Sequence, residues 1–145
     1  WGSGRVGIRL SPYGSFNDIA DSDPQKLFSY LINALNPLNL SYLHLIEPRA
    51  TTAGGSDQLH ADAPRTGRLF RPLFAGKVVL SGCFDQACAE KAITEGEADA
   101  IAFGRLFISN PDLPRRFELN ADLNPYNRAT FYGGNEKGYT DYPSL

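Results

Sequence analysis

The stretch that decides the fold is Ala100-Ile-Ala-Phe-Gly-Arg-Leu-Phe107, a short apolar run that ends at Gly104 and Arg105. Val78-Val-Leu-Ser-Gly82 has the same form. Both runs are typical of buried strands, and a glycine at the end of a strand leaves backbone N–H groups open to a ligand. Two adjacent strands that end in this way are what a (β/α) barrel uses to bind a cofactor phosphate after its last two strands.

Two further apolar runs, Val6–Leu10 and Tyr42–Ile46, precede these two. All four are continuous rather than alternating, which predicts strands that are buried on both faces. Helix signals separate them, because capping residues or prolines open segments in which apolar residues recur at helical spacing. The predicted helices cover residues 23–36, 66–74, 85–96 and 110–117, and the apolar positions of the first are Leu27, Tyr30, Leu31, Ala34 and Leu35.

The regular alternation of strands and helices predicts a parallel α/β fold with crossover connections. A doubly wound sheet and a TIM (β/α)8 barrel both satisfy this order. A barrel takes about 250 residues for eight units, so the 145 residues of this chain suit four units and a tail. We therefore predict the C-terminal half of a barrel over residues 5–118, with an irregular, aromatic-rich tail over 119–145. A four-stranded open sheet would fit as well, but it would leave two exposed edges.

The composition excludes several classes of function. The formal net charge of −2 gives no electrostatic reason to expect nucleic acid or an anionic membrane as a partner. No apolar run is long enough for a transmembrane helix. Cys83 and Cys88 have neither zinc nor redox spacing, and His44 and His60 make no metal pattern. We expect two reduced thiols, no metal, and a cytoplasmic protein.

Two features could carry chemistry. Arg9 lies near the end of its strand, where a guanidinium needs either a salt bridge, for example to Glu47, or an electron-rich ligand edge. Gly82 and Gly104 could serve tight turns alone, but the pair favours a phosphate site, in which Arg105 would bind the anion through two hydrogen bonds.

Two other features allow more than one interpretation. His44 fits a strand core, and a packing role is its simplest interpretation. The paired aromatics Phe131 and Tyr132 could anchor the tail or flank a flat cofactor. The polar stretch Arg49–Arg65, which contains His60, is predicted to be a loop at the catalytic face.

Four stretches together resemble the old yellow enzymes, and within them the alkene and 12-oxophytodienoate reductases. They are Gly7–Pro12, Tyr42–Arg49, Ala102–Leu113 and Tyr126–Tyr132, and Gly138–Pro143 fits the same branch. The resemblance implies an FMN-dependent TIM barrel that takes a hydride from NADPH or NADH. It also implies a small-molecule substrate, an α,β-unsaturated carbonyl compound (an enone) whose C=C bond is reduced.

The resemblance also implies roles for individual residues. Arg9 corresponds to the arginine at the N1/O2 edge of the flavin, where its charge would stabilise the reduced ring. Gly82, Gly104 and Arg105 correspond to the phosphate cradle, with Cys83 supplying a backbone N–H. The stretch Arg49–Arg65 corresponds to the loop that covers the site, and the aromatic pair beside the flavin is Phe131 and Tyr132, with Tyr132 facing the substrate.

The carbonyl clamp and the proton donor of this family lie in the first half of the barrel, and this sequence opens at what would be the fifth strand. No catalytic residue is therefore assigned here, and the isolated chain is expected to be inactive, as a fragment or a truncated gene product. Two alternatives stay open. One is a non-catalytic half-barrel that binds FMN or another phosphate ligand weakly, or pairs through its open edges with the missing N-terminal half or a second copy. The other is a stand-alone open-sheet domain for another phosphate ligand.

Overall fold

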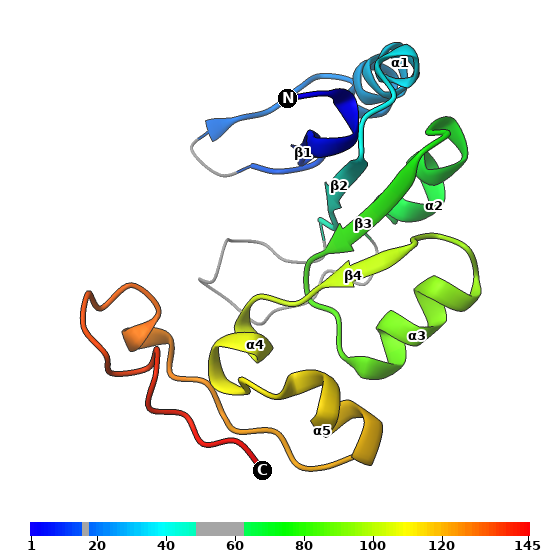
Figure 1. Cartoon of the computed structure of the whole chain (residues 1–145). Helices are drawn as coiled ribbons and strands as arrows, with labels where there is room; N and C mark the ends of the chain where they lie inside the picture. Colours follow the sequence, from blue (N-terminus) through cyan, green and yellow to red (C-terminus); the bar gives the residue numbers. More distant parts are fainter. Residues whose placement is uncertain (16–17, 49–62) are drawn as a thin grey trace. The chain divides into compact units, whose positions relative to one another are not determined.

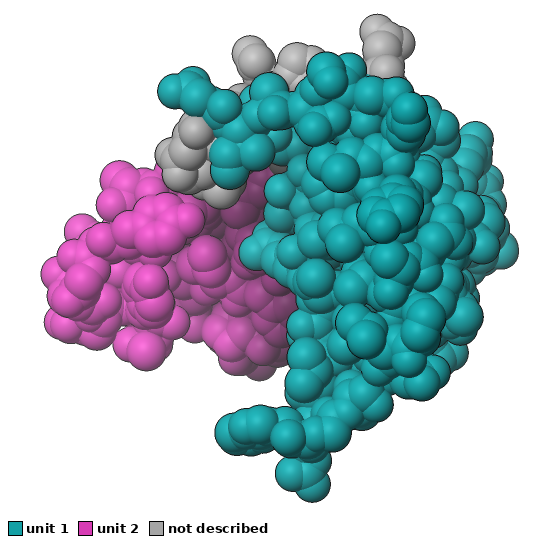
Figure 2. Space-filling view, turned by 90° about the horizontal axis from the view of Figure 1, so that it is seen from above, with its two compact units in different colours: residues 1–102 teal, residues 103–145 magenta. Residues whose placement is uncertain are grey.

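A computed structural model describes residues 1–15, 18–48 and 63–145. The chain divides into two compact units, Trp1–Ala102 and Phe103–Leu145, which Figure 2 colours teal and magenta. Each unit is described by itself below. His60 and most of the predicted loop Arg49–Arg65 lie outside the described residues.

The first unit is built on a four-stranded parallel sheet with the order β1-β2-β3-β4 (Figure 1). Successive parallel strands joined by crossovers of one hand place all their helices on the same face of the sheet. A doubly wound sheet would reverse its strand order, which this sheet does not do. The order therefore confirms four parallel strands of the kind that form part of a TIM barrel. Their bounds are β1 Gly7–Leu10, β2 Tyr42–Ile46, β3 Lys77–Ser81 and β4 Ala100–Ala102.

Helices α1, α2 and α3 follow the first three strands and lie along one side of the sheet (Figure 1). Asp23 caps the first of them by accepting a hydrogen bond from the Lys26 amide, at 3.1 Å, and Asp85 caps the third in the same way. The helices are α1 Pro24–Leu35, α2 Thr66–Phe70 and α3 Gln86–Thr94, with 3-10 turns η1 Ser3–Arg5, η3 Asn36–Leu38 and η4 Arg71–Leu73.

Within the described part of the chain, only one face of the sheet is buried. Leu43 and Leu45 on β2 are fully buried, as are Val78 and Leu80 on β3. The side chains between them point to the opposite face, because strand side chains alternate, and His44 there is only half-buried. The prediction of strands buried on both faces is thus wrong for these residues, since the helices of this unit cover a single face.

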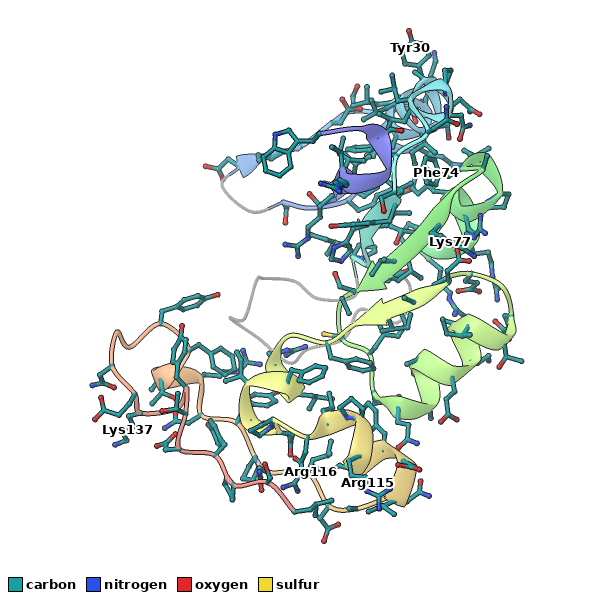
Figure 3. The ribbon with its side chains drawn as sticks, in the orientation of Figure 1. Tyr30, Phe74, Lys77, Arg115, Arg116 and Lys137 are labelled. Atoms are coloured by element: carbon teal, nitrogen blue, oxygen red, sulfur yellow. The ribbon has the colours of Figure 1, made fainter. Side chains whose placement is uncertain are left out.

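Of the apolar positions that the spacing predicted for helix α1, only Leu35 is fully part of the buried stripe. Ile32 and Leu35 are its buried residues, whereas Leu27 and Tyr30 are 44% and 76% exposed. Tyr30 stands at the outer side of the helix, away from the sheet (Figure 3). Apolar residues surround much of this helix, so spacing alone did not identify the stripe that faces the core.

The second unit begins with two short helices where the sequence predicted one. The chain leaves β4 after Ala102 and forms α4 (Arg105–Ser109), and α5 (Leu113–Leu119) then starts later than predicted. Asn110 does not open α5, whose N-cap residue is Asp112, but it is the C-cap residue of α4. Its amide donates to the Leu106 carbonyl at 2.9 Å, and its side-chain oxygen accepts from the Asn124 amide at 2.7 Å. Asn110 therefore joins the two short helices to the tail.

The aromatic-rich tail contains one 3-10 turn, η5 (Arg128–Thr130), and is fastened to α5 by Arg116. The buried guanidinium of Arg116 donates to the Asp112 carboxylate at 2.8 Å and to the carbonyls of Asp122 and Pro143 at 2.6 and 3.0 Å. Figure 3 shows this side chain between α5 and the C-terminal segment. Since a buried guanidinium needs acceptors for its donors, these bonds hold the irregular tail in one conformation.

A search of the described residues finds no helix with the length and apolar character that a membrane crossing requires.

Candidate functional site

The turn after β3 requires glycine at its first position. Gly82 has a φ of +115°, and a Cβ built there would lie 2.8 Å from the Glu47 carbonyl oxygen. Cys83 follows with a φ of +52°. Only glycine adopts the first conformation without strain, and a non-glycine residue in the second is uncommon. The backbone therefore turns sharply at the end of β3, as the glycine-ended strand predicted.

Glu47 caps the start of α2 and does not pair with Arg9. Its carboxylate is 1% exposed and accepts the amides of Thr66 and Gly67, at 3.2 and 3.0 Å, at the start of α2. Its own amide donates to the Ser81 carbonyl at 2.7 Å. Of the two interpretations of Arg9, the salt bridge to Glu47 is therefore wrong. The cap was missed because Glu47 and Thr66 are 19 positions apart in the sequence.

The N-terminus of α3 already carries an anion. The Asp85 carboxylate accepts the Cys88 amide at 2.7 Å. A helix N-terminus attracts negative charge, but a phosphate at this one would meet the carboxylate first. The turn at Gly82 and Cys83 lies ahead of this helix.

Gly104 and Arg105 lie at the start of the second unit, directly after Phe103. Gly104 is exposed with a φ of −91°, and a Cβ built there would meet nothing within 4 Å. No side chain caps α4. Arg105 is half-buried, and its Cζ lies 5.9 Å from the centre of the Tyr126 ring, a cation–π contact that orients the guanidinium. An accessible backbone followed by an oriented cation suits an anion such as a phosphate.

Arg9 and His44 lie on the face of the sheet that no helix of this unit covers. Their Cα atoms are paired in the register of β1 and β2, and Arg9 is exposed. His44 Nε2 lies 2.9 Å from Ser81 Oγ, so the histidine has the hydrogen-bond partner that a packing role predicts. Burial lowers the pKa of His44, and the nearby positive charge of Arg9 lowers it further.

The aromatic pair in the tail divides between interior and surface of the second unit. Phe131 is 5% exposed and its ring lies 5.6 Å from that of Tyr126, while Tyr139 donates its hydroxyl to the Phe131 carbonyl at 3.0 Å. Tyr132 is 84% exposed. Phe131 thus anchors the tail, and Tyr132 is the member of the pair that is accessible in this unit.

The described residues contain no group of three metal-ligating side chains and no disulfide between Cys83 and Cys88, both of which are half-buried. Within those residues, the candidate site therefore consists of backbone amides, arginines and aromatic rings. This donor set suits an anionic, aromatic cofactor rather than a metal ion.

Comparison with known proteins gives consistent matches. The sequence profile of the NADH:flavin oxidoreductase / NADH oxidase family matches residues 1–124. The 12-oxophytodienoate reductase 1 of Oryza sativa subsp. japonica is 46% identical over 147 residues, and the 12-oxophytodienoate reductase 2 of Arabidopsis thaliana is 43% identical over 145 residues. Both alignments cover 99% of this chain, but only 37% and 38% of those proteins.

Solved structures give the same result. Morphinone reductase superimposes with a TM-score of 0.85 and 41% identity, over 99% of this chain and 37% of that one. The old yellow enzyme from Trypanosoma cruzi superimposes with a TM-score of 0.86 and 33% identity, over 99% and 36%. A further structure holds morphinone reductase in complex with tetrahydroNAD, and it is 41% identical with a TM-score of 0.83 over 97% of this chain and 36% of that one. The chain thus spans a little over a third of the length of the relatives it matches.

Proposed function

Because this chain belongs to the NADH:flavin oxidoreductase / NADH oxidase family, we propose that it is the part of an FMN-dependent ene reductase that binds the FMN phosphate. The family takes FMN as its flavin and a reduced nicotinamide as its hydride donor. The substrate class that we propose is the α,β-unsaturated carbonyl compounds, reduced at the C=C bond. The names of the relatives support this, since they include 12-oxophytodienoate reductases and morphinone reductase.

The observation that carries the proposal is the accessible backbone at Gly104. A Cβ there would stand in open space, so none of the described residues requires a glycine at this position. A ligand that approaches the backbone closely does require one. Arg105 follows directly, and the guanidinium would bind phosphate oxygens with charge-assisted hydrogen bonds.

The first unit would contribute the amides of the turn at Gly82 and Cys83. The α3 N-terminus is occupied by the Asp85 carboxylate, so we place the phosphate at the turn ahead of this helix. A backbone N–H donates whatever side chain the residue carries, so a cysteine at position 83 is compatible with this role.

FMN, when bound, supplies the hydride-transfer chemistry. Arg9 would donate hydrogen bonds to the pyrimidine edge of the ring and stabilise negative charge there. Tyr132 would contact the substrate, and the buried Phe131 would hold it in place. The carbonyl clamp and the proton donor are proposed to lie in the remainder of the enzyme, so the 145-residue chain alone is expected not to turn over.

Titration of the chain with FMN and with riboflavin, followed by flavin fluorescence, tests the proposal. The two ligands differ in the phosphate alone. We expect FMN to bind at least tenfold more tightly than riboflavin. Arg105→Ala should weaken the binding of FMN by about 1.5–3 kcal/mol, the usual contribution of a charge-assisted hydrogen bond. The binding of riboflavin should stay the same. Equal affinity for the two ligands in the unchanged chain would refute a phosphate site.

A second candidate function rests on the edges of the sheet. Strands β1 and β4 each have one neighbour within the described residues, so each presents unpaired backbone groups along its outer side. A non-catalytic half-barrel would pair through these edges with the N-terminal half or with a second copy, and would bind FMN or another phosphate ligand weakly. Light scattering during size-exclusion chromatography tests this: a monomer at micromolar concentration would argue against self-association.

A further inference from the structure

Three polar side chains form a row across the uncovered face of the sheet. Arg9 is on β1, His44 is its register partner on β2, and Ser81 ends β3. Neighbouring strands lie about 4.8 Å apart, so the side chains of register partners on one face are adjacent. His44 Nε2 is 2.9 Å from Ser81 Oγ. The row therefore runs continuously from the arginine to the last residue before the turn at Gly82.

A serine within hydrogen-bond distance of a histidine could be a nucleophile and its base. Such a pair needs an acid that stabilises the imidazolium. The charged neighbour of His44 is instead a cation, Arg9, and both this charge and burial lower the pKa of His44.

Two carboxylates next to the ends of neighbouring strands are engaged elsewhere. Glu47 binds the amides of α2, and Asp99 binds Lys77 at 2.9 Å and the Val78 amide at the same distance. Lys77 is the other charged residue on this face, and its partner is Asp99. Nothing in this surrounding set therefore activates Ser81, and the row needs another explanation.

We propose that neutral His44 is a positioning residue that holds Arg9 against the flavin ring and is itself anchored by Ser81. This inference rests on the proposed function. A guanidinium only donates hydrogen bonds, so the ring nitrogen that meets Arg9 must carry a lone pair. Nε2 is already engaged with Ser81. The tautomer that satisfies both partners has the proton on Nε2, donated to Ser81 Oγ, and leaves Nδ1 to accept from Arg9.

The row also links the two ends of the proposed flavin site. Ser81 is followed directly by Gly82, and its carbonyl accepts the Glu47 amide at 2.7 Å, so its backbone is fixed. Because the imidazole is anchored to Ser81, it would fix the position of Arg9 relative to β3, the strand that leads into the proposed phosphate turn. The long, flexible arginine side chain would otherwise lose rotamer freedom on binding the ring, at a cost in affinity. Holding it in place beforehand removes part of that cost.

The first experiment reads the row without any ligand. Long-range ¹H–¹⁵N NMR spectra of the chain report the tautomer of His44, with His44→Gln used to assign its signals. We expect a neutral ring at pH 7 with the proton on Nε2, and a higher pKa in Arg9→Gln. A ring protonated on Nδ1, or an imidazolium at pH 7, would overturn the proposal.

The second experiment measures flavin affinity in His44→Phe and His44→Gln, each with circular dichroism as the check of folding. Phenylalanine fills the space but accepts no hydrogen bond, whereas glutamine keeps an acceptor and a donor. We expect His44→Phe to weaken FMN and riboflavin by the same factor, about tenfold, and to shift the absorption band of the bound flavin. Glutamine should restore both affinities to within about threefold.

The outcomes separate this inference from the proposed function. Unchanged affinity in His44→Phe, or a loss that glutamine does not restore, would overturn the positioning role while leaving FMN binding intact. A chain that binds neither flavin before any substitution would refute the proposed function itself, and the role of His44 toward the flavin with it. If His44→Phe lost affinity for FMN but not for riboflavin, the effect would lie at the phosphate, and this result would also count against the inference.

Discussion

Alanine at Gly104 and alanine at Gly82 should have opposite consequences, although both glycines follow a strand. At position 104 the backbone φ of −91° is open to any residue, and a Cβ would meet nothing within 4 Å. The free energy of unfolding should change by less than about 1 kcal/mol, since an alanine at a helix N-cap costs little and glycine loses more entropy on folding. At position 82 the φ of +115° and the approach of 2.8 Å to the Glu47 carbonyl oxygen should cost about 2–4 kcal/mol.

Binding should separate the two variants further. If a phosphate approaches the backbone at Gly104, a methyl group there stands in its path, and Gly104→Ala should lose at least tenfold in FMN affinity with riboflavin unaffected. Urea denaturation gives the stabilities, and fluorescence titration with the two flavins gives the affinities. The reasoning would be refuted if Gly104→Ala bound FMN as well as the unchanged chain, or if Gly82→Ala were as stable as it.

Three further predictions concern stability. Glu47→Gln should destabilise the chain by about 2 kcal/mol, because a neutral amide cannot accept both α2 amides with charge assistance; urea denaturation against Glu118→Gln, an exposed control, would show it. Arg116→Ala should cost about 3 kcal/mol and speed hydrogen exchange over residues 120–145, with Arg116→Lys intermediate; equal exchange in all three chains would contradict the role of the guanidinium. Because the pKa of His44 is lowered on folding from 6.5, the unfolded chain binds more protons just below that pH. The free energy of unfolding should thus fall as the pH drops from 7 through 6.5 toward the folded pKa, and this component should be missing from His44→Gln.

The strands could be predicted from the sequence because each is a compact apolar run bounded by turn residues. Their order along the sheet followed from crossover topology, once the alternation with helices was recognised. Helix α3 was also recoverable, since Asp85 marks its start and Gly96 follows its end, where the φ is +71°. These features depend on local sequence, and local sequence is what the patterns report.

The features that could not be predicted are either contacts between residues far apart in the sequence or elements too short to show a pattern. Helix α4 has five residues, too few for a hydrophobic period to emerge. The cap that Glu47 places on α2 joins residues that are 19 positions apart in the sequence. The contact of His44 with Ser81 links residues that are 37 positions apart, and only the register of the parallel strands brings them together.

The candidate site divides in the same way. A glycine at the end of a strand marked Gly82 and Gly104 alike, but the sequence could not show that one is required by the fold and the other is not. That distinction depends on φ and on what a Cβ would meet. Likewise, the pattern paired Phe131 with Tyr132, and only burial separates the anchor from the accessible ring.

The most direct measurement is an experimental structure of the chain with FMN bound. The proposal predicts phosphate oxygens at hydrogen-bond distance, about 2.7–3.2 Å, from the amide of Cys83 and from the amide and guanidinium of Arg105. A phosphate bound at any other part of the chain, with these donors turned away from it, would contradict the account.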